Sequence, residues 1–178
     1  FAAEEKQTVL ILKVRSNLAI FNSRQALKVR KEFDDKKWLI GGHSLGGVVA
    51  AMAVANEPES FEGLYLMGSY SISDISNWNK LALMLLAEND GLTNLKDIED
   101  NEDNLPERID TKGIYDLMSL GNTSGKTVYY TILGGNHRQV GRYGAQEGDD
   151  EASIDMASQH LEIYNVLVMF MRNNDLVD

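Results

Sequence analysis

The chain has 178 residues, of which 43% are hydrophobic and 25% charged, with no cysteine and a formal net charge of −10. These proportions are ordinary for one globular domain and exclude a disordered or low-complexity chain. The lack of cysteine excludes disulfides, thiolate metal ligands and a cysteine nucleophile. The acidic charge disfavours nucleic acids and anionic membrane surfaces as partners, and no run approaches the ~20 apolar residues of a membrane span. We therefore expect a single domain over residues 1–178, with no nucleic-acid partner and no membrane span.

Short apolar runs and segments with helical spacing alternate along the chain. Because the runs are apolar at consecutive positions, they are typical of parallel strands buried on both faces. The predicted strands are residues 8–14, 38–42, 64–68, 81–87 and 127–133. The predicted helices are residues 16–33, with Ser16 as a candidate cap, 45–56, 114–120 and 152–172. This alternation predicts an α/β fold with a mostly parallel twisted sheet flanked by helices.

Several other polar and large residues are expected to have a structural rather than a catalytic role. The acidic stretch 97–110 is expected to be a solvated loop, and no set of acidic residues or histidines indicates a metal site. Asp149 and Asp150 precede the last predicted helix, so they are expected to cap it rather than to catalyse. The expected packing residues are Trp38, Met67, Met84, Met169 and Met171.

The sequence GHSLG, residues 42–46, lies between a predicted buried strand and a predicted helix of small residues. A serine at such a sharp turn adopts a strained backbone and projects its hydroxyl clear of the sheet, and glycines two positions away avoid collisions. The pattern therefore predicts Ser44 as a nucleophile, with the N–H of Leu45 donating to a developing oxyanion. The alternative, a glycine-rich phosphate-binding loop, lacks the lysine of a Walker motif.

A serine hydroxyl needs a base to remove its proton, and that base needs an orienting carboxylate. The chain has three histidines. His137 follows a predicted strand through a glycine-containing loop, which makes it the candidate base. His43 lies beside the serine and is interpreted as structural or pocket-lining, whereas His160 lies within the last predicted helix.

The carboxylate is expected after another strand, since ligands of parallel α/β sheets bind along the carboxyl ends of the strands. Asp90 follows the run 81–87 and is the preferred acid; Glu88 is the runner-up and Asp74 the third choice. The candidates Ser44, Asp90 and His137 occur in the nucleophile–acid–base order of α/β-hydrolases.

On these residues the sequence resembles the α/β-hydrolase superfamily, and more narrowly its small bacterial members near the dienelactone hydrolases, many without an assigned substrate. The similar segments are GGHSLGG (41–47), GSY (68–70), AENDG (87–91) and GGNHRQVGRYGAQEGDD (134–150). The resemblance covers the chain from about residue 8 onward. It implies Ser44 as nucleophile, Asp90 as acid and His137 as base, with the Leu45 amide in the oxyanion hole and no metal or organic cofactor.

The superfamily takes its second oxyanion donor from a loop after an earlier strand. Residues 1–6 resemble the end of the helix that follows this loop, so we expect the first strands of the fold to lie upstream of this chain. A sheet edge left open in this way would favour self-association, so a homo-oligomer is one expectation.

The sequence thus predicts a serine hydrolase that cleaves a small carboxylic ester through an acyl-enzyme intermediate. A thioesterase, lactonase or acyltransferase with the same triad, and a non-catalytic binding domain of the same shape, stay open as alternatives. The compartment is also open, with the cytoplasm favoured. The expected pocket residues are His43, Ser69, Tyr70, Arg138 and Tyr143.

Overall fold

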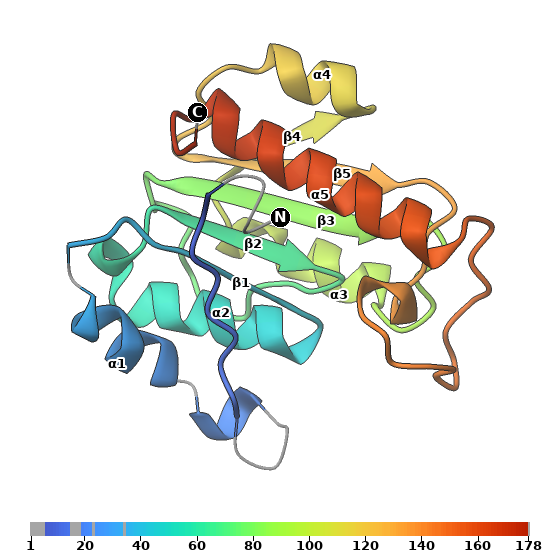
Figure 1. Ribbon diagram of the computed structural model, residues 1–178, viewed down its shortest axis with the longest axis horizontal. Coiled ribbons are helices and arrows are strands. Elements are labelled where there is room, and N and C mark those ends of the chain that lie inside the picture. The colour runs from blue at the N-terminus through green and yellow to red at the C-terminus, as the bar shows by residue number, and fades with distance from the viewer. Residues whose placement is uncertain (1–5, 15–18, 23, 34, 178) are drawn as a thin grey trace.

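The computed structural model describes residues 6–14, 19–22, 24–33 and 35–177 (Figure 1). Five strands form one sheet in the order β1-β2-β3-β5-β4, and every neighbouring pair is parallel. The strands are β1 (Leu39–His43), β2 (Gly63–Met67), β3 (Leu81–Ala87), β4 (Glu107–Thr111) and β5 (Lys126–Ile132). The predicted α/β fold with a parallel sheet is confirmed.

Helices cover both faces of the sheet. They are α1 (Gln25–Glu32), α2 (Leu45–Asn56), α3 (Leu95–Asp100), α4 (Ile114–Ser119) and α5 (Met156–Asn173). Short 3₁₀ turns lie at η2 (Ala19–Asn22), η3 (Pro58–Ser60), η4 (Glu102–Asn104) and η5 (Arg138–Val140). One core cluster joins α1, α2 and α3 to one face of the sheet, and a second joins α4 and α5 to the other. Because helices cover both faces of the sheet, β2, β3 and β5 are apolar at consecutive positions.

The predicted strand at residues 8–14 is wrong. This segment is irregular, and Ile11 is 92% exposed. Its neighbours Val9 and Leu10 line a cavity of about 690 Å³ beside β1 and α5. The apolar run therefore does not mark a buried strand: Val9 and Leu10 are exposed as well, and the segment pairs with none of the described strands.

The predicted loop at 97–110 is also wrong, because it contains most of α3, η4 and part of β4. Strand β4 lies at the edge of the sheet and pairs only with β5. Its exposed side chains are charged, and Arg108 forms ion pairs with Glu102 and Asp110. An edge strand of this kind carries no buried apolar run, which is the pattern that identified the other strands.

The predicted helix at 45–56 coincides with α2, while the other predicted helices differ at their ends. The interval 16–33 contains η2 and α1, while Ser16 lies outside the described residues. Helix α5 begins at Met156 because Asp155 caps it and accepts a hydrogen bond from the Ser158 N–H at 2.7 Å. The expectation that Asp149 and Asp150 cap this helix is therefore wrong.

The predicted packing residues lie in or against the core. Met84 and Met171 are buried, while Trp38, Met67 and Met169 are partly buried against the two clusters. No helix in the described part of the chain is long and apolar enough to cross a membrane.

Candidate active site

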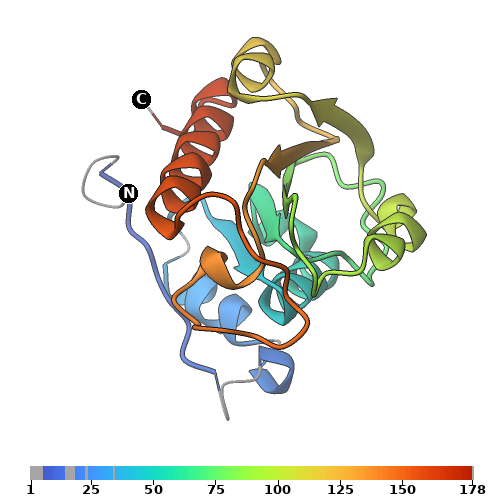
Figure 2. The ribbon, with the colours of Figure 1, turned by 90° about the vertical axis from the view of Figure 1, so that its right-hand side faces the viewer.

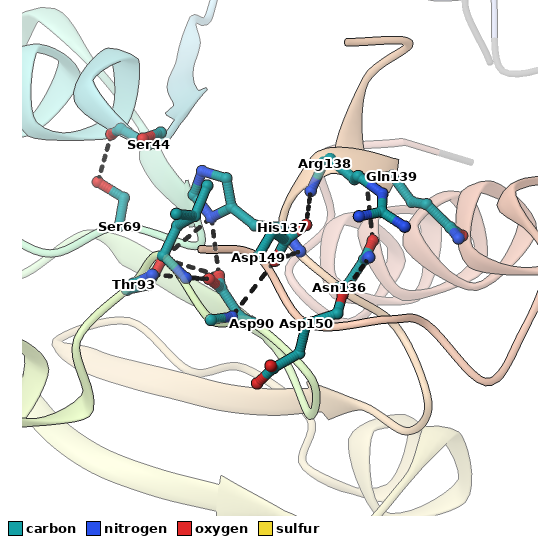
Figure 3. Close-up of polar contacts among 12 residues, drawn as sticks. Ser44, Ser69, Asp90, Thr93, Asn136, His137, Arg138, Gln139, Asp149 and Asp150 are labelled. Carbon is teal, nitrogen blue, oxygen red and sulfur yellow. Dashed lines mark hydrogen bonds and ion pairs between the residues drawn. The ribbon is translucent and has the colours of Figure 1, made fainter. Parts of the chain in front are cut away.

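Ser44 occupies a strained turn between β1 and α2. Its backbone angles are φ 53° and ψ −128°, a region that non-glycine residues rarely adopt. Hydrogen bonds hold the turn: the Ser44 N–H donates to Met67 O at 3.0 Å, and the Ser44 carbonyl accepts from the N–H groups of Gly47 at 2.9 Å and Val48 at 3.4 Å. The same carbonyl accepts from Ser69 Oγ at 2.7 Å (Figure 3). The surrounding structure thus maintains a conformation that costs of order 1–3 kcal/mol.

Two glycines fix the close approach of this turn to its neighbours. A Cβ on Gly42 would lie 2.6 Å from Gly46 O, and a Cβ on Gly47 would lie 2.5 Å from Ser69 Oγ. A Cβ on Gly46, by contrast, would meet nothing within 4 Å. The prediction that collisions require glycine on both sides of the serine is therefore right for Gly42 and wrong for Gly46.

His137 and Asp90 are brought together from loops after β5 and β3. The distance from His137 Nδ1 to Asp90 Oδ2 is 2.9 Å, and the two side chains are only 4% and 7% exposed (Figure 3). Because an ionised carboxylate only accepts hydrogen bonds, we assign the imidazole proton to Nδ1. The lone pair then lies on Nε2.

Asp90 is held as an anion by several donors. Its Oδ1 accepts from the N–H groups of Leu92 at 3.0 Å and Thr93 at 2.7 Å, and its Oδ2 accepts from Thr93 Oγ1 at 2.7 Å. Burial acts to raise the pKa of Asp90, but the hydrogen bonds from His137 and Thr93 outweigh it and leave the pKa below its ordinary value.

The three predicted residues converge around Gly68, at the carboxyl end of β2. A Cβ at Gly68 would lie 2.8 Å from Asp90 Oδ2 and 3.0 Å from His137 Nδ1, while Met67, the preceding residue, bonds the Ser44 amide. Figure 3 shows the His137 ring between Ser44 and Asp90. Among the described residues, no hydrogen bond joins the Ser44 hydroxyl to this ring. Such bonds are often long without substrate.

The loop that carries His137 is anchored by Asp149. Its carboxylate accepts from the N–H groups of Gly91 at 3.3 Å, His137 at 3.2 Å and Arg138 at 2.9 Å. It therefore joins the loop of the base to the loop of the acid. Figure 2, which faces this end of the sheet, shows the loop after β5 crossing it.

Two buried residues, Asn136 and Gln159, attach the same loop to helix α5. The Asn136 N–H donates to Gln159 Oε1 at 3.0 Å, and Gln159 Nε2 donates to Asn136 O at 2.8 Å. Both side chains are fully buried. The pair fixes the residue before the base to helix α5.

Sequence reasoning missed Thr93, Asn136 and Gln159 and gave Asp149 the wrong role. The spacing Asp90-x-x-Thr93 is a signal that was available, because aspartate often accepts from backbone N–H groups two and three residues later. The contact from Asp149 to Gly91 spans 58 residues, so local sequence carries no sign of it.

His43 lies between two rings. Its ring centroid is 4.1 Å from that of His137 and 5.4 Å from that of Tyr143, which is stacked on it at 17°. Its Nε2 is buried and has no hydrogen-bond partner among the residues that the structure describes. Burial, and secondarily repulsion from His137, lowers the pKa of His43 to about 4, so its ring is neutral at pH 7.

The other predicted pocket residues have different surroundings. Ser69 is buried beneath the Ser44 turn, and Tyr70 packs against the core. Arg138 pairs with Glu151 at 2.7 Å, while Tyr143 is 57% exposed.

The runner-up acids are engaged elsewhere. Glu88 accepts from the Gly134 N–H at 2.8 Å, and Asp74 is bonded to the N–H and hydroxyl of Ser76 at 3.0 Å and 2.7 Å. Within the described ranges, no three histidine or acidic side chains gather as metal ligands would.

Residues 2–161 match the sequence profile of the alpha/beta hydrolase family, and the chain belongs to this family. Membership supports a hydrolase activity in general. A search among curated proteins found no match. The narrower similarity to dienelactone hydrolases stays a prediction.

Two solved structures have a similar fold. One is described as a predicted CIB-like hydrolase from Thermoplasma acidophilum, with a TM-score of 0.53 and 11% identity, and the match covers 88% of this chain and 61% of that chain. The other is MGS-MChE2, an alpha/beta hydrolase enzyme from the metagenome of lagoon sediments at Mar Chica, Morocco, with a TM-score of 0.58 and 15% identity, covering 91% of this chain and 73% of that chain. The chain thus spans less than two thirds of the first protein, and at these identities the likeness concerns the fold alone.

Proposed function

We propose that the protein is a serine hydrolase that cleaves a small carboxylic ester with Ser44, His137 and Asp90 as its triad. The observation that carries the proposal is the buried 2.9 Å contact between His137 and Asp90 beside the strained Ser44 turn. An imidazole that donates one hydrogen bond to a buried carboxylate and turns its other nitrogen toward a serine is the arrangement that serine hydrolases use.

In the proposed reaction, His137 Nε2 takes the Ser44 hydroxyl proton as Oγ attacks the acyl carbon. The negative charge that develops on the carbonyl oxygen is stabilised by the Leu45 N–H, a first-turn donor that has no partner within α2. His137 then gives the proton to the leaving alcohol. Water repeats the sequence on the acyl-enzyme and releases the acid, while Asp90 stabilises the imidazolium.

A fluorophosphonate probe tests the nucleophile directly. The full-length protein should become labelled and should hydrolyse p-nitrophenyl butyrate, and Ser44→Ala should lose both properties. Ser124→Ala is the matched control, because Ser124 is exposed in the turn before β5. Labelling that persists in Ser44→Ala would remove Ser44 from the nucleophile role, and a folded wild type that never labels would favour the binding-domain alternative.

A thioesterase, lactonase or acyltransferase would use the same residues, since the choice among these bonds depends on the pocket and not on the triad. Parallel assays with matched oxygen esters, thioesters and lactones separate them. The proposal expects kcat/KM to be highest for the open-chain oxygen ester.

A further inference from the structure

Large apolar side chains are exposed in the segments that follow the strands of the candidate site. They follow the carboxyl ends of β1, β2, β3 and β5, which all point to one end of the parallel sheet (Figures 1 and 2). We call them the apolar rim; its members are Leu45, Ile72, Leu92, Leu95 and Tyr143. Their exposed fractions lie between 38% and 66%. Exposed large apolar side chains in the segments that border a candidate site are typical of a ligand-binding surface.

The structure connects parts of this rim to the site. Leu45 is the residue after Ser44, and Leu92 donates its N–H to Asp90 Oδ1. Tyr143 stacks on His43, which in turn contacts the ring of His137. Leu92 also approaches Gly148, where an added Cβ would lie 3.2 Å from Leu92 Cδ2, so it lies beside the loop that crosses the sheet end.

Several charged groups around the rim already have hydrogen-bond or ion-pair partners. Arg138 is paired with Glu151, Asp149 accepts from three backbone N–H groups, and Asp90 is bonded to His137 and Thr93. His43 is neutral because its pKa is near 4. Arg142 is an exposed cation of the same loop, which makes an anionic substrate the alternative to be tested.

We infer that the apolar rim binds the acyl chain of the substrate, and that the enzyme therefore prefers uncharged esters with an extended apolar acyl group. The inference rests on the proposed function and narrows its substrate class. Burying methylenes against the rim contributes binding free energy that acetate esters cannot gain. The acyl carbon would lie at Ser44, with the chain running over the neighbouring loops.

A chain-length series tests this inference. We expect kcat/KM for p-nitrophenyl octanoate to exceed that for the acetate by about tenfold or more, since each buried methylene adds severalfold. Octanoate is used below the concentration at which it forms micelles. The octanoate-to-acetate ratio should fall severalfold in Ile72→Ser and in Leu95→Ser. It should stay unchanged in Met118→Ser, whose side chain is exposed at the end of α4, near the start of β5.

The outcomes separate this inference from the proposed function. If Ser44 is labelled by the fluorophosphonate but acetate and octanoate react equally well, the rim inference fails and the proposed function stands. A preference for the anionic monosuccinate ester would also overturn it, in favour of recognition through Arg142. A preference for octanoate that appears only with emulsified substrate would also overturn the rim inference, because the rim would then contact a lipid surface. Absence of labelling at Ser44 would overturn both.

Discussion

His137 and Asp90 lie 47 residues apart in the sequence and meet through a 2.9 Å contact that is almost fully shielded from water. The charged form of a carboxylate buried in this way is stabilised only while its hydrogen-bond donors are present. Changes at either residue should therefore affect the chemistry more than the fold, provided that the shape of the side chain is kept.

Asp90→Asn keeps the shape of the side chain but removes the charge that fixes the proton on His137 Nδ1. We expect kcat to fall by about 10⁴, as it does when the acid of a serine triad is replaced by its amide. The measurement is steady-state ester hydrolysis. Asp74→Asn should retain full activity because Asp74 bonds only to nearby Ser76; equal losses in both variants would contradict the assignment of the acid.

Thr93 positions Asp90 through its hydroxyl and its N–H. Thr93→Val keeps the volume but leaves Asp90 Oδ2 without one donor, so kcat should fall roughly tenfold, in line with the ~1.5–3 kcal/mol of a hydrogen bond to a charged group. The pKa of Asp90 should rise as well, because the hydrogen bond from the Thr93 hydroxyl helps to hold it below its ordinary value. Thr93→Ser restores the hydroxyl and should restore both quantities; a Thr93→Ser variant as impaired as Thr93→Val would show that packing is the cause.

Asp149 should matter for stability as well as for activity. Asp149→Ala leaves the N–H groups of Gly91, His137 and Arg138 without their acceptor, which should cost about 1–3 kcal/mol in the free energy of unfolding. Urea denaturation measures this cost. Asp150→Ala is the adjacent control, because Asp150 accepts from Asn136 Nδ2 through its backbone carbonyl, which the substitution keeps. The same loss of stability in both variants would argue against the anchoring role of Asp149.

The glycines of the Ser44 turn give a matched pair of variants. Gly42→Ala introduces a Cβ that collides with the backbone at Gly46, so it should destabilise the protein by about 1–3 kcal/mol and reduce activity. Gly46→Ala has open space and should leave the thermal midpoint nearly unchanged. Thermal unfolding followed by circular dichroism distinguishes them, and a more harmful Gly46→Ala would contradict the geometry.

The neutral state of His43 predicts a dependence of stability on pH. Its pKa is about 4 in the folded chain and about 6.5 when unfolded, so between these values the unfolded chain binds more protons. Stability contributed at this position is therefore complete above pH 6.5 and is lost as the pH falls toward 4.

Side-chain NMR of the histidines measures this titration directly, and His43→Asn removes it. The difference in unfolding free energy between wild type and His43→Asn should change between pH 6.5 and 4.5 and stay constant above pH 7. A His43 ring that titrates near 6.5 would overturn the prediction.

The sequence was sufficient for the buried strands β2, β3 and β5 and for β1, which is half-buried at one edge of the described sheet. Strands β1, β2, β3 and β5 are apolar at successive positions, and the glycines around Ser44 mark a sharp turn. It was insufficient for β4, because charged residues interrupt the apolar pattern of this edge strand. It was also insufficient for residues 8–14, where an apolar run is largely exposed and pairs with none of the described strands.

For the candidate site, the sequence order and the strand ends suggested which residues would meet. The 2.9 Å contact between His137 and Asp90 agrees with that suggestion. The residues that hold them were not predictable in the same way, because Asp149 and Gln159 act through backbone groups far away in the chain. Contacts of this kind depend on the three-dimensional course of loops rather than on a residue pattern.

Helix α2 carries Ser44 at its start and is lined by small residues that are almost entirely inaccessible, among them Ala51, Ala53 and Val54. Segments packed so densely exchange their amide hydrogens only when much of the molecule opens, whereas exposed loops exchange early. The proposed nucleophile thus adjoins a helix that opens late, while Ile72, Leu92 and Tyr143 lie in connecting segments, which tolerate replacement more readily. Under the proposed function, ligand preference could therefore change in this scaffold without disturbing the turn that holds Ser44.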